Sequence, residues 1–428
     1  MHLSTTVVAS ALAIGASAGS NYLGFNSGAT LPDRSAKFKK DFEAEFKTAQ
    51  ALNSAPGTFN SVRLYTNIQA YSKDDPIEAF EAAIETKTNM LLGVWASGTD
   101  NIDKEITALK KAVTKYGTKF TDLVIGMSIG SEDLYRDSVA GRKNKGGLGA
   151  SPDTILKFIK DYKKAFADGP LSKVPVGHVD TWDVWTNSTI KSVIDAVDFL
   201  GVDEYPYYEN DKGNDIKNAG HLFDKAFDAT VAAANGKPVW VTETGWPYTG
   251  PTWDQGVASV ENAKYYWDEV GCRKLFNKVP TFWYNLRDSN PDNKMKFAIT
   301  KDLSPKPLFD LTCPKTFDTK PQTTPTSSAA GTSTASSSKS ADTGASKPAS
   351  SGSSDSSSSG GSGVNGGSGG SGANGGSGTV NGASGSGSST TPASAATTTA
   401  NSAVGSYGKL SGVACFAIAL VAGGVALL

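Results

Sequence analysis

The chain has 428 residues and a formal net charge of −1, and its charged side chains form no basic run. This composition excludes a nucleic-acid partner, which would need a positively charged face to match the phosphate backbone. Nearly all of the aromatic residues lie before residue 318, so we expect one folded unit of roughly 300 residues.

Residues 1–18 are predicted to be a secretory signal peptide that is removed from the mature protein. A short polar start is followed by an apolar run at 7–16, and Ala16-Ser17-Ala18 has the small-x-small form of a signal-peptidase site. The protein is therefore expected to be extracellular, in an oxidising compartment.

Between residues 19 and 318, strand-like runs alternate with longer amphipathic runs. Eight runs are predicted as strands: 21–26, 61–65, 90–96, 122–132, 174–180, 199–205, 238–243 and 281–286. Seven runs are predicted as helices: 34–52, 76–86, 102–116, 151–166, 188–197, 216–234 and 259–270. The helix at 34–52 is typical, because Phe38, Phe42, Phe46 and Ala49 recur at spacings of three and four.

Eight strands, each but the last followed by a helix, predict an α/β fold, a closed parallel (β/α)8 or TIM barrel over residues 19–318. An open doubly wound sheet is the alternative. That fold would need a glycine-rich phosphate loop after its first strand, and Asn26-Ser-Gly-Ala does not supply one.

The run 122–132 alternates bulky residues with small or polar ones. Leu123, Ile125, Met127 and Ile129 are expected to face the helices. The alternate residues are expected to face the lumen: Gly126, Ser128, Gly130 and Glu132. On this alternation Glu132 points into the mouth of the barrel and Asp133 points away. By the same parity argument, Glu204 is expected to lie outside the lumen.

The carboxyl ends of the strands, where active sites of such barrels lie, carry two acids, Glu132 and Glu243, together with several aromatic residues. Two acids among aromatic rings suit glycoside hydrolysis, in which one acid protonates the leaving oxygen and the other attacks the anomeric carbon. His178 and His221 are interpreted as structural. The sequence has no CxxC or Cys/His metal motif and no phosphate cradle, so we expect neither a metal nor a cofactor.

The string Trp240-Val-Thr-Glu-Thr-Gly-Trp-Pro247 resembles the nucleophile signature of glycoside hydrolase family 17, the β-1,3-glucanases, and residues 19–313 resemble its fungal cell-wall members. The resemblance implies that Glu243 is the nucleophile, Glu132 is the proton donor and β-1,3-glucan is the substrate. It also implies a retaining mechanism, with the two carboxyl groups about 5–5.5 Å apart. Most of the family has Asn before the acid to contact the sugar 2-hydroxyl, whereas this chain has Ser131, which has a shorter reach.

Arg63 and Tyr65 share one face of the strand at 61–65 and are expected in the lumen. The Arg63 guanidinium should lie close to Glu243 and favour its charged form. Four further residues at strand ends are expected to contact substrate: Asp203, Tyr205, Trp246 and Tyr284.

The C-terminal part is predicted to be a stalk and a membrane-anchor signal. Residues 319–401 are mainly Ser, Gly, Thr, Ala and Asn, too polar to offset their chain entropy, and are expected to be disordered. Small residues around Asn401, a spacer and an apolar tail have the order of a GPI signal. We expect attachment at Asn401, removal of 402–428 and anchoring in the outer leaflet of the plasma membrane. A C-terminal transmembrane helix is the alternative.

Two covalent modifications are expected in the folded unit. Cys415 lies in the tail that anchoring would remove, which leaves Cys272 and Cys313 as the one possible intrachain disulfide. Asn187-Ser-Thr189 is a sequon for N-glycosylation.

The leading interpretation is a monomeric endo-hydrolase of β-1,3-glucan at the surface of a fungal cell. A β-1,3-glucan transglycosylase would use the same two acids but transfer to a second glucan. A wall-anchored glucan-binding protein with weakened catalysis is a third possibility, which Ser131 favours.

Overall fold

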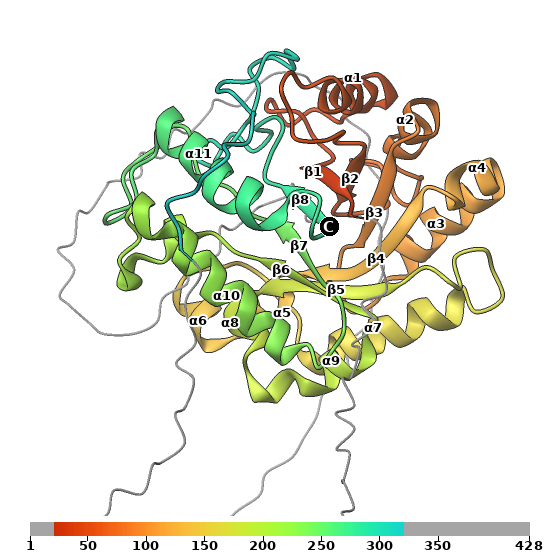
Figure 1. The fold of residues 1–428 in the computed structure, drawn as a ribbon. Helices are drawn as coiled ribbons and strands as arrows, with labels where there is room; N and C mark the ends of the chain where they lie inside the picture. Colours follow the sequence, from red (N-terminus) through yellow and green to blue (C-terminus); the bar gives the residue numbers. More distant parts are fainter. Residues whose placement is uncertain (1–20, 321–428) are drawn as a thin grey trace, which may run out of the picture. The chain divides into compact units, whose positions relative to one another are not determined.

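A computed structural model describes residues 21–320. The predicted signal peptide, the stalk beyond residue 320 and the anchor signal lie outside the described residues. Within 21–320, eight parallel strands close into a barrel in which each strand pairs with the next and β8 pairs with β1 (Figure 1). The strands are β1 (Leu23–Ser27), β2 (Ser61–Leu64), β3 (Asn89–Val94), β4 (Val124–Ser131), β5 (Val176–Thr181), β6 (Phe199–Asp203), β7 (Val239–Glu243) and β8 (Thr281–Trp283).

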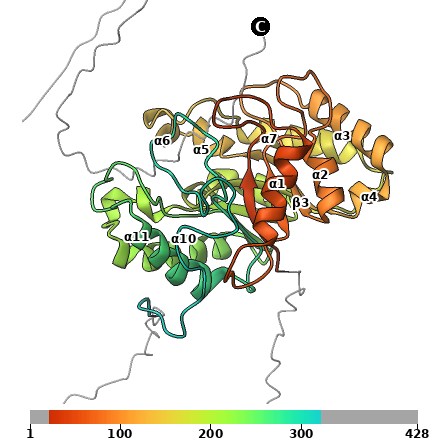
Figure 2. The same ribbon diagram turned by 90° about the horizontal axis from the view of Figure 1, so that it is seen from above.

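Helices surround this barrel. The longer ones are α1 (Lys39–Gln50), α2 (Ala79–Thr86), α3 (Asp103–Tyr116), α7 (Pro152–Ala165), α9 (Lys191–Ala196), α10 (Ala219–Ala233) and α11 (Val260–Tyr266), which continues into the π-helical segment η5 (Trp267–Leu275). Helices α1 to α3 lie on the opposite side of the barrel from α10 and α11 (Figures 1 and 2). The predicted (β/α)8 barrel is confirmed. No helix within residues 21–320 is long and apolar enough to cross a bilayer.

Several short helices were not predicted, because segments of three to five residues show no periodic pattern. They are α4 (Thr118–Thr121), α5 (Asp133–Asp137), α6 (Val139–Lys143), α8 (Trp182–Trp185), η2 (Pro206–Tyr208) and η3 (Asn210–Lys212). Two further short segments, η1 (Ser188–Ile190) and η4 (Ile216–Asn218), form the first turns of the predicted helices at 188–197 and 216–234. Helix α5 directly follows the predicted acid Glu132, so it bears on the site.

Helix α7 shows why these residues form these elements. The Ser151 hydroxyl accepts a hydrogen bond from the Thr154 N–H, and Pro152 occupies the first turn, where a missing N–H has no cost. The buried side chains recur at spacings of three and four, so that one face packs on the barrel: Ile155, Phe158, Ile159 and Tyr162.

The lumen is filled by an apolar cluster with one residue from each of four strands: Leu91, Phe199, Trp240 and Phe282. The rings of Phe199 and Trp240 stack with centroids 4.3 Å apart. Gly126 makes room, since a Cβ there would lie 3.2 Å from the Trp240 ring. Ile125, which was expected to face the helices, packs against this cluster, because the pairing of β3 with β4 shifts between Met90 and Leu91. The cluster blocks the lumen, so the polar side chains that follow it in the strands face the mouth.

The predicted disulfide between Cys272 and Cys313 is confirmed. It joins η5 to the segment that follows β8, with the two Cα atoms 5.5 Å apart. The sequon residue Asn187 is exposed, and its Oδ1 accepts hydrogen bonds from the Thr189 N–H (3.0 Å) and hydroxyl (2.9 Å). Glycosylation at Asn187 stays a prediction.

Replacing Cys272 and Cys313 together by serine is expected to lower the free energy of unfolding by about 3–4 kcal/mol, because the bridge closes a long loop in the unfolded chain. Urea denaturation followed by tryptophan fluorescence measures this change. The wild-type protein under a reducing agent should show the same loss, and an unchanged unfolding midpoint in both would contradict the prediction.

Candidate active site

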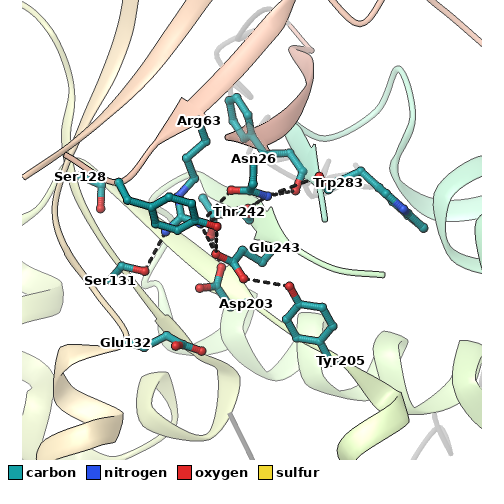
Figure 3. A network of polar contacts seen from close by, with 12 residues as sticks. Asn26, Arg63, Ser128, Ser131, Glu132, Asp203, Tyr205, Thr242, Glu243 and Trp283 are labelled. Carbon is teal, nitrogen blue, oxygen red and sulfur yellow. Dashed lines mark hydrogen bonds and ion pairs between the residues drawn. The ribbon is translucent and has the colours of Figure 1, made fainter. Parts of the chain in front are cut away.

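Glu243, the last residue of β7, is 1% exposed and accepts three hydrogen bonds (Figure 3). Its Oε1 accepts from Arg63 Nη1 and from the Tyr65 hydroxyl, each at 2.6 Å. Its Oε2 accepts from the Tyr205 hydroxyl at 2.8 Å. A carboxylate, which can only accept, suits this set of donors. Arg63 therefore contacts Glu243, as expected, whereas the bonds from Tyr65 and Tyr205 to Glu243 were not predicted.

Arg63 is a buried guanidinium, also 1% exposed, that connects four strands of the barrel. Besides Glu243, it donates to Asn26 Oδ1 at 2.9 Å and from Nη2 to the Ser131 hydroxyl at 2.8 Å. It also lies over the Tyr65 ring, 4.7 Å from the centroid. Breaking such a buried pair by removing one partner costs about 3–5 kcal/mol, because the other charge stays buried.

Asn26 at the end of β1 is a site residue that the sequence interpretation missed. Its Nδ2 donates to the carbonyl oxygens of Thr242 and Phe282, each at 3.0 Å, while its Oδ1 accepts from Arg63. It thus ties β1 to β7 and β8 beneath Glu243. A polar side chain closing an otherwise apolar strand was the available signal.

Glu132 follows β4 and is buried at the mouth of the barrel. In Figure 3 it lies below the contacts of Arg63, whereas Asn26 lies above them. Arg136 Nη2, from α5, donates to Glu132 Oε2 at 2.7 Å, a contact that was not predicted. Burial raises the pKa of Glu132 to about 8; the Arg136 charge opposes this shift and the Glu243 charge adds to it. Glu132 therefore holds a proton at neutral pH.

Glu132 reaches the mouth by a route that differs from the predicted alternation. The pairing of β4 with β5 shifts between Ser128 and Ser131, and Gly130 has φ +84°. The predicted alternation placed Gly130 in the lumen and Ser131 outside it. Because of this bulge, the Ser131 hydroxyl instead faces the lumen and contacts Arg63. Glu132 itself has φ 57° and ψ 20°, a left-handed conformation that ends the strand. Its orientation was predicted correctly but for the wrong reason.

Two other predicted contacts lie beside the network. Asp203 pairs in register with Glu243, and its Oδ1 accepts from the Thr242 hydroxyl at 2.6 Å. Burial, together with the Glu243 charge, raises the pKa of Asp203 well above its ordinary value. Tyr284 packs edge-on against Tyr205, with centroids 5.9 Å apart. Their contacts with substrate stay predictions.

Trp246 lies among other aromatic rings and, within residues 21–320, forms no hydrogen bond with Glu132 or Glu243. It packs edge-on against Tyr207, with centroids 5.1 Å apart, and its indole N–H donates to the Val257 carbonyl at 2.9 Å. A role for Trp246 in substrate binding stays a prediction. Glu204 is buried, and burial raises its pKa well above the ordinary value; it is not among the side chains that contact Glu243.

The site therefore combines a protonated carboxyl after β4 with a second, multiply hydrogen-bonded carboxyl at the end of β7, at one mouth of a parallel barrel. This arrangement defines the class of barrel glycosidases, which need one acid to donate a proton and another to carry negative charge. Among residues 21–320, no group of three His, Cys, Asp or Glu side chains is placed to hold a metal ion.

The comparisons agree with this class. The model of the BtgE/BtgC glycoside hydrolase domain matches residues 29–300, and the chain belongs to this family. It is 51% identical over 294 residues to a protein of Aspergillus oryzae named "Probable glucan endo-1,3-beta-glucosidase eglC", an alignment that covers 68% of this chain and 63% of the relative. An Aspergillus fumigatus protein of the same name is 49% identical over 311 residues, which are 72% of this chain and 69% of that protein.

A solved structure shares the fold. The glycoside hydrolase family 17 β-1,3-glucanosyltransferase from Rhizomucor miehei superposes with a TM-score of 0.52 at 24% identity, covering 68% of this chain and 99% of that one. The family model and this structure thus establish the family and the barrel. The chain spans about 63% of the length of the Aspergillus oryzae relative.

The raised pKa of Glu132 makes stability depend on pH. The ordinary value is 4.5 and the folded value is about 8, so the folded protein keeps a proton that the unfolded chain releases. The contribution of Glu132 to the free energy of unfolding is fully present below about pH 4.5 and is lost as pH rises through 8. Relative to Glu132→Gln, the wild-type free energy of unfolding should fall by a few kcal/mol over this window. Urea denaturation of both proteins at pH 5 and pH 8.5 measures the difference, and parallel pH profiles would contradict it.

Proposed function

We propose that the protein is a retaining endo-hydrolase of β-1,3-glucan, with Glu243 as nucleophile and Glu132 as acid and base. The observation that carries this proposal is the contrast between the two carboxyl groups. Glu243 is surrounded by three donors, one of them a guanidinium, whereas Glu132 is held protonated by burial. The names of the Aspergillus relatives support β-1,3-glucan as the substrate and internal bonds as the point of cleavage.

In the first step, a Glu243 oxygen attacks the anomeric carbon while the Glu132 proton passes to the glycosidic oxygen, and the bond between that carbon and that oxygen breaks. The product is a glycosyl ester on Glu243 and a free chain with a new hydroxyl. In the second step, Glu132, now a carboxylate, takes a proton from water. The water oxygen attacks the same carbon, and Glu243 leaves as a carboxylate.

The geometry explains how one residue acts as acid and then as base. The negative charge of Glu243 contributes to the raised pKa of Glu132. When Glu243 becomes an ester it loses that charge, so the pKa of Glu132 falls and its carboxylate is favoured for the second step. Arg63, Tyr65 and Tyr205 hold Glu243 in place through both steps.

Ser131 is compatible with catalysis. Its hydroxyl oxygen accepts from Arg63 Nη2 at 2.8 Å, which orients the side chain toward the lumen. The hydroxyl hydrogen remains to donate to the 2-hydroxyl of a bound sugar, the contact that strengthens in the transition state. This argues against the interpretation of a glucan-binding protein with weakened catalysis.

Release of reducing ends from linear β-1,3-glucan tests the proposal, with a β-1,4-glucan as the control substrate. Wild-type protein should cleave the first and leave the second intact. Glu243→Gln and Glu132→Gln should each lower kcat at least about 10³-fold, since each removes a group that the reaction needs. The anomeric configuration of the first product, measured by NMR, should be β.

Three outcomes would change this assignment. An α product would contradict retention. Products longer than the substrate would indicate transglycosylation, which uses the same two acids and a glucan acceptor in place of water. A wild-type protein as inert as Glu243→Gln, yet able to bind glucan, would favour the binding protein.

We also propose that the protein acts outside the cell, secreted through residues 1–18 and anchored at Asn401 to the outer leaflet of the plasma membrane and the cell wall. The stalk at 319–401 would hold the barrel away from the membrane. Phosphatidylinositol-specific phospholipase C should release the protein from membranes, and Asn401→Pro should reduce that release sharply if Asn401 is the attachment residue. A protein that stays membrane-bound after the phospholipase would support the transmembrane alternative instead.

A further inference from the structure

His178 lies in the middle of β5, fully buried, and was interpreted as structural. Its two ring nitrogens both face acceptors. Nδ1 lies 2.6 Å from the Ile129 carbonyl oxygen of the neighbouring strand β4, and Nε2 lies 3.0 Å from Asp180 Oδ2. A carbonyl oxygen only accepts, so Nδ1 must carry a hydrogen.

The surroundings of Asp180 decide the state of Nε2. Asp180 accepts backbone N–H groups from Leu134 (2.9 Å), Tyr135 (3.2 Å) and Thr181 (2.9 Å). Three backbone N–H donors stabilise the charged form of this carboxyl group, so the proton between Asp180 Oδ2 and His178 Nε2 belongs on the imidazole. Nε2 must then donate as well, so His178 is a doubly protonated imidazolium. Burial opposes this charge, but Asp180 and Asp133 outweigh it and raise the pKa of His178.

Both sides of Glu132 are connected to this imidazolium. After Glu132, the N–H groups of Leu134 and Tyr135, in the first turn of α5, are held by Asp180. Before it, the Ser131 N–H donates to Asp133 Oδ2 at 2.7 Å, and Asp133 interacts electrostatically with His178. The Glu132 N–H itself donates to the Val179 carbonyl, between His178 and Asp180, at 2.9 Å.

The turn requires this support because its backbone is strained. The left-handed conformation of Glu132 costs on the order of 1–3 kcal/mol for a residue with a Cβ and persists only where the surroundings enforce it. The packing is close as well. A Cβ at Gly130 would lie 2.3 Å from Asp133 Oδ2 and 3.1 Å from His178 Cε1.

We propose that His178 is a positioning residue: its imidazolium, donating to the Ile129 carbonyl and to Asp180, fixes the turn that aims Glu132 at the leaving oxygen. This inference rests on the proposed function of Glu132 as the acid. His178 acts through Asp180 and does not touch the substrate. Its loss therefore impairs proton donation and leaves attack by Glu243 intact.

Aryl β-laminaribiosides with different leaving groups separate these two effects. A phenyl leaving group needs a proton from Glu132, whereas 2,4-dinitrophenol leaves without one. General acid catalysis is worth about 10²–10⁴-fold. His178→Gln, whose amide cannot reach both acceptors, should lower kcat/KM for the phenyl substrate at least tenfold and change it less than about twofold for the dinitrophenyl substrate.

Trp185→Phe is the matched control, because this ring packs edge-on against His178 at 5.7 Å and donates to the Gly201 carbonyl instead of to the turn. Trp185→Phe should change kcat/KM by the same factor for both substrates. An equal loss on both substrates in His178→Gln, or no loss on either, would overturn the proposal. Inactivity of the wild type on both substrates would contradict the proposed function instead.

The charge state is tested on the wild-type protein, which needs no variant to fold. With ¹⁵N-labelled histidine, NMR at pH 7 should show a bonded proton on both ring nitrogens of His178. A neutral ring, with one nitrogen bare, would overturn the proposal whatever the kinetics. Asp180→Asn should shift the ring toward the neutral form and reproduce the selective loss on the phenyl substrate.

Discussion

The buried ion pair between Arg63 and Glu243 is the constraint on which the rest of the site depends. Neither charge has access to water, so the other donors and acceptors of the pair need protein partners, and among the described residues only Arg63 Nε of this pair is left without one. Asn26, Ser131, Tyr65 and Tyr205 supply these partners from four strands or strand ends. The network explains why polar side chains accumulate at one mouth of a barrel whose lumen is otherwise filled by apolar rings.

The two carboxyl groups differ because their partners differ. Glu243 is the last residue of β7 and accepts from three donors. Glu132 follows the bulge in β4, has a left-handed conformation itself and accepts from one side-chain donor, Arg136. Burial then raises the pKa of Glu132 to about 8 despite that partner. Opposite environments for two like groups are the general way in which one site obtains both an acid and a nucleophile.

A second layer of buried charged groups lies behind Glu132, the proposed acid. His178, Asp180 and Asp133 are buried, and their hydrogen bonds go to backbone groups on both sides of Glu132 rather than to its carboxyl group. Such a layer can orient an acid without adding a donor that would lower its pKa. Glu243, the proposed nucleophile, is therefore held through its own oxygens, whereas Glu132, the proposed acid, is held through its backbone and a single bond from Arg136.

The barrel could be predicted from the sequence because strand and helix periodicities alternate along the chain. The positions of Glu132, Glu243 and Arg63 at one mouth of the barrel, and the disulfide, could also be predicted, because each stands out locally as a charge or a cysteine at a defined place. Other features depend on which strands become neighbours. The bulge at Gly130, the bonds of Asn26 to β7 and β8, and the two acceptors around His178 involve residues far apart in sequence or a shift in pairing register. Periodicity carries no information on register shifts or on cross-strand hydrogen bonds, so the orientation of Glu132 and the groups that hold it became visible only in the folded barrel.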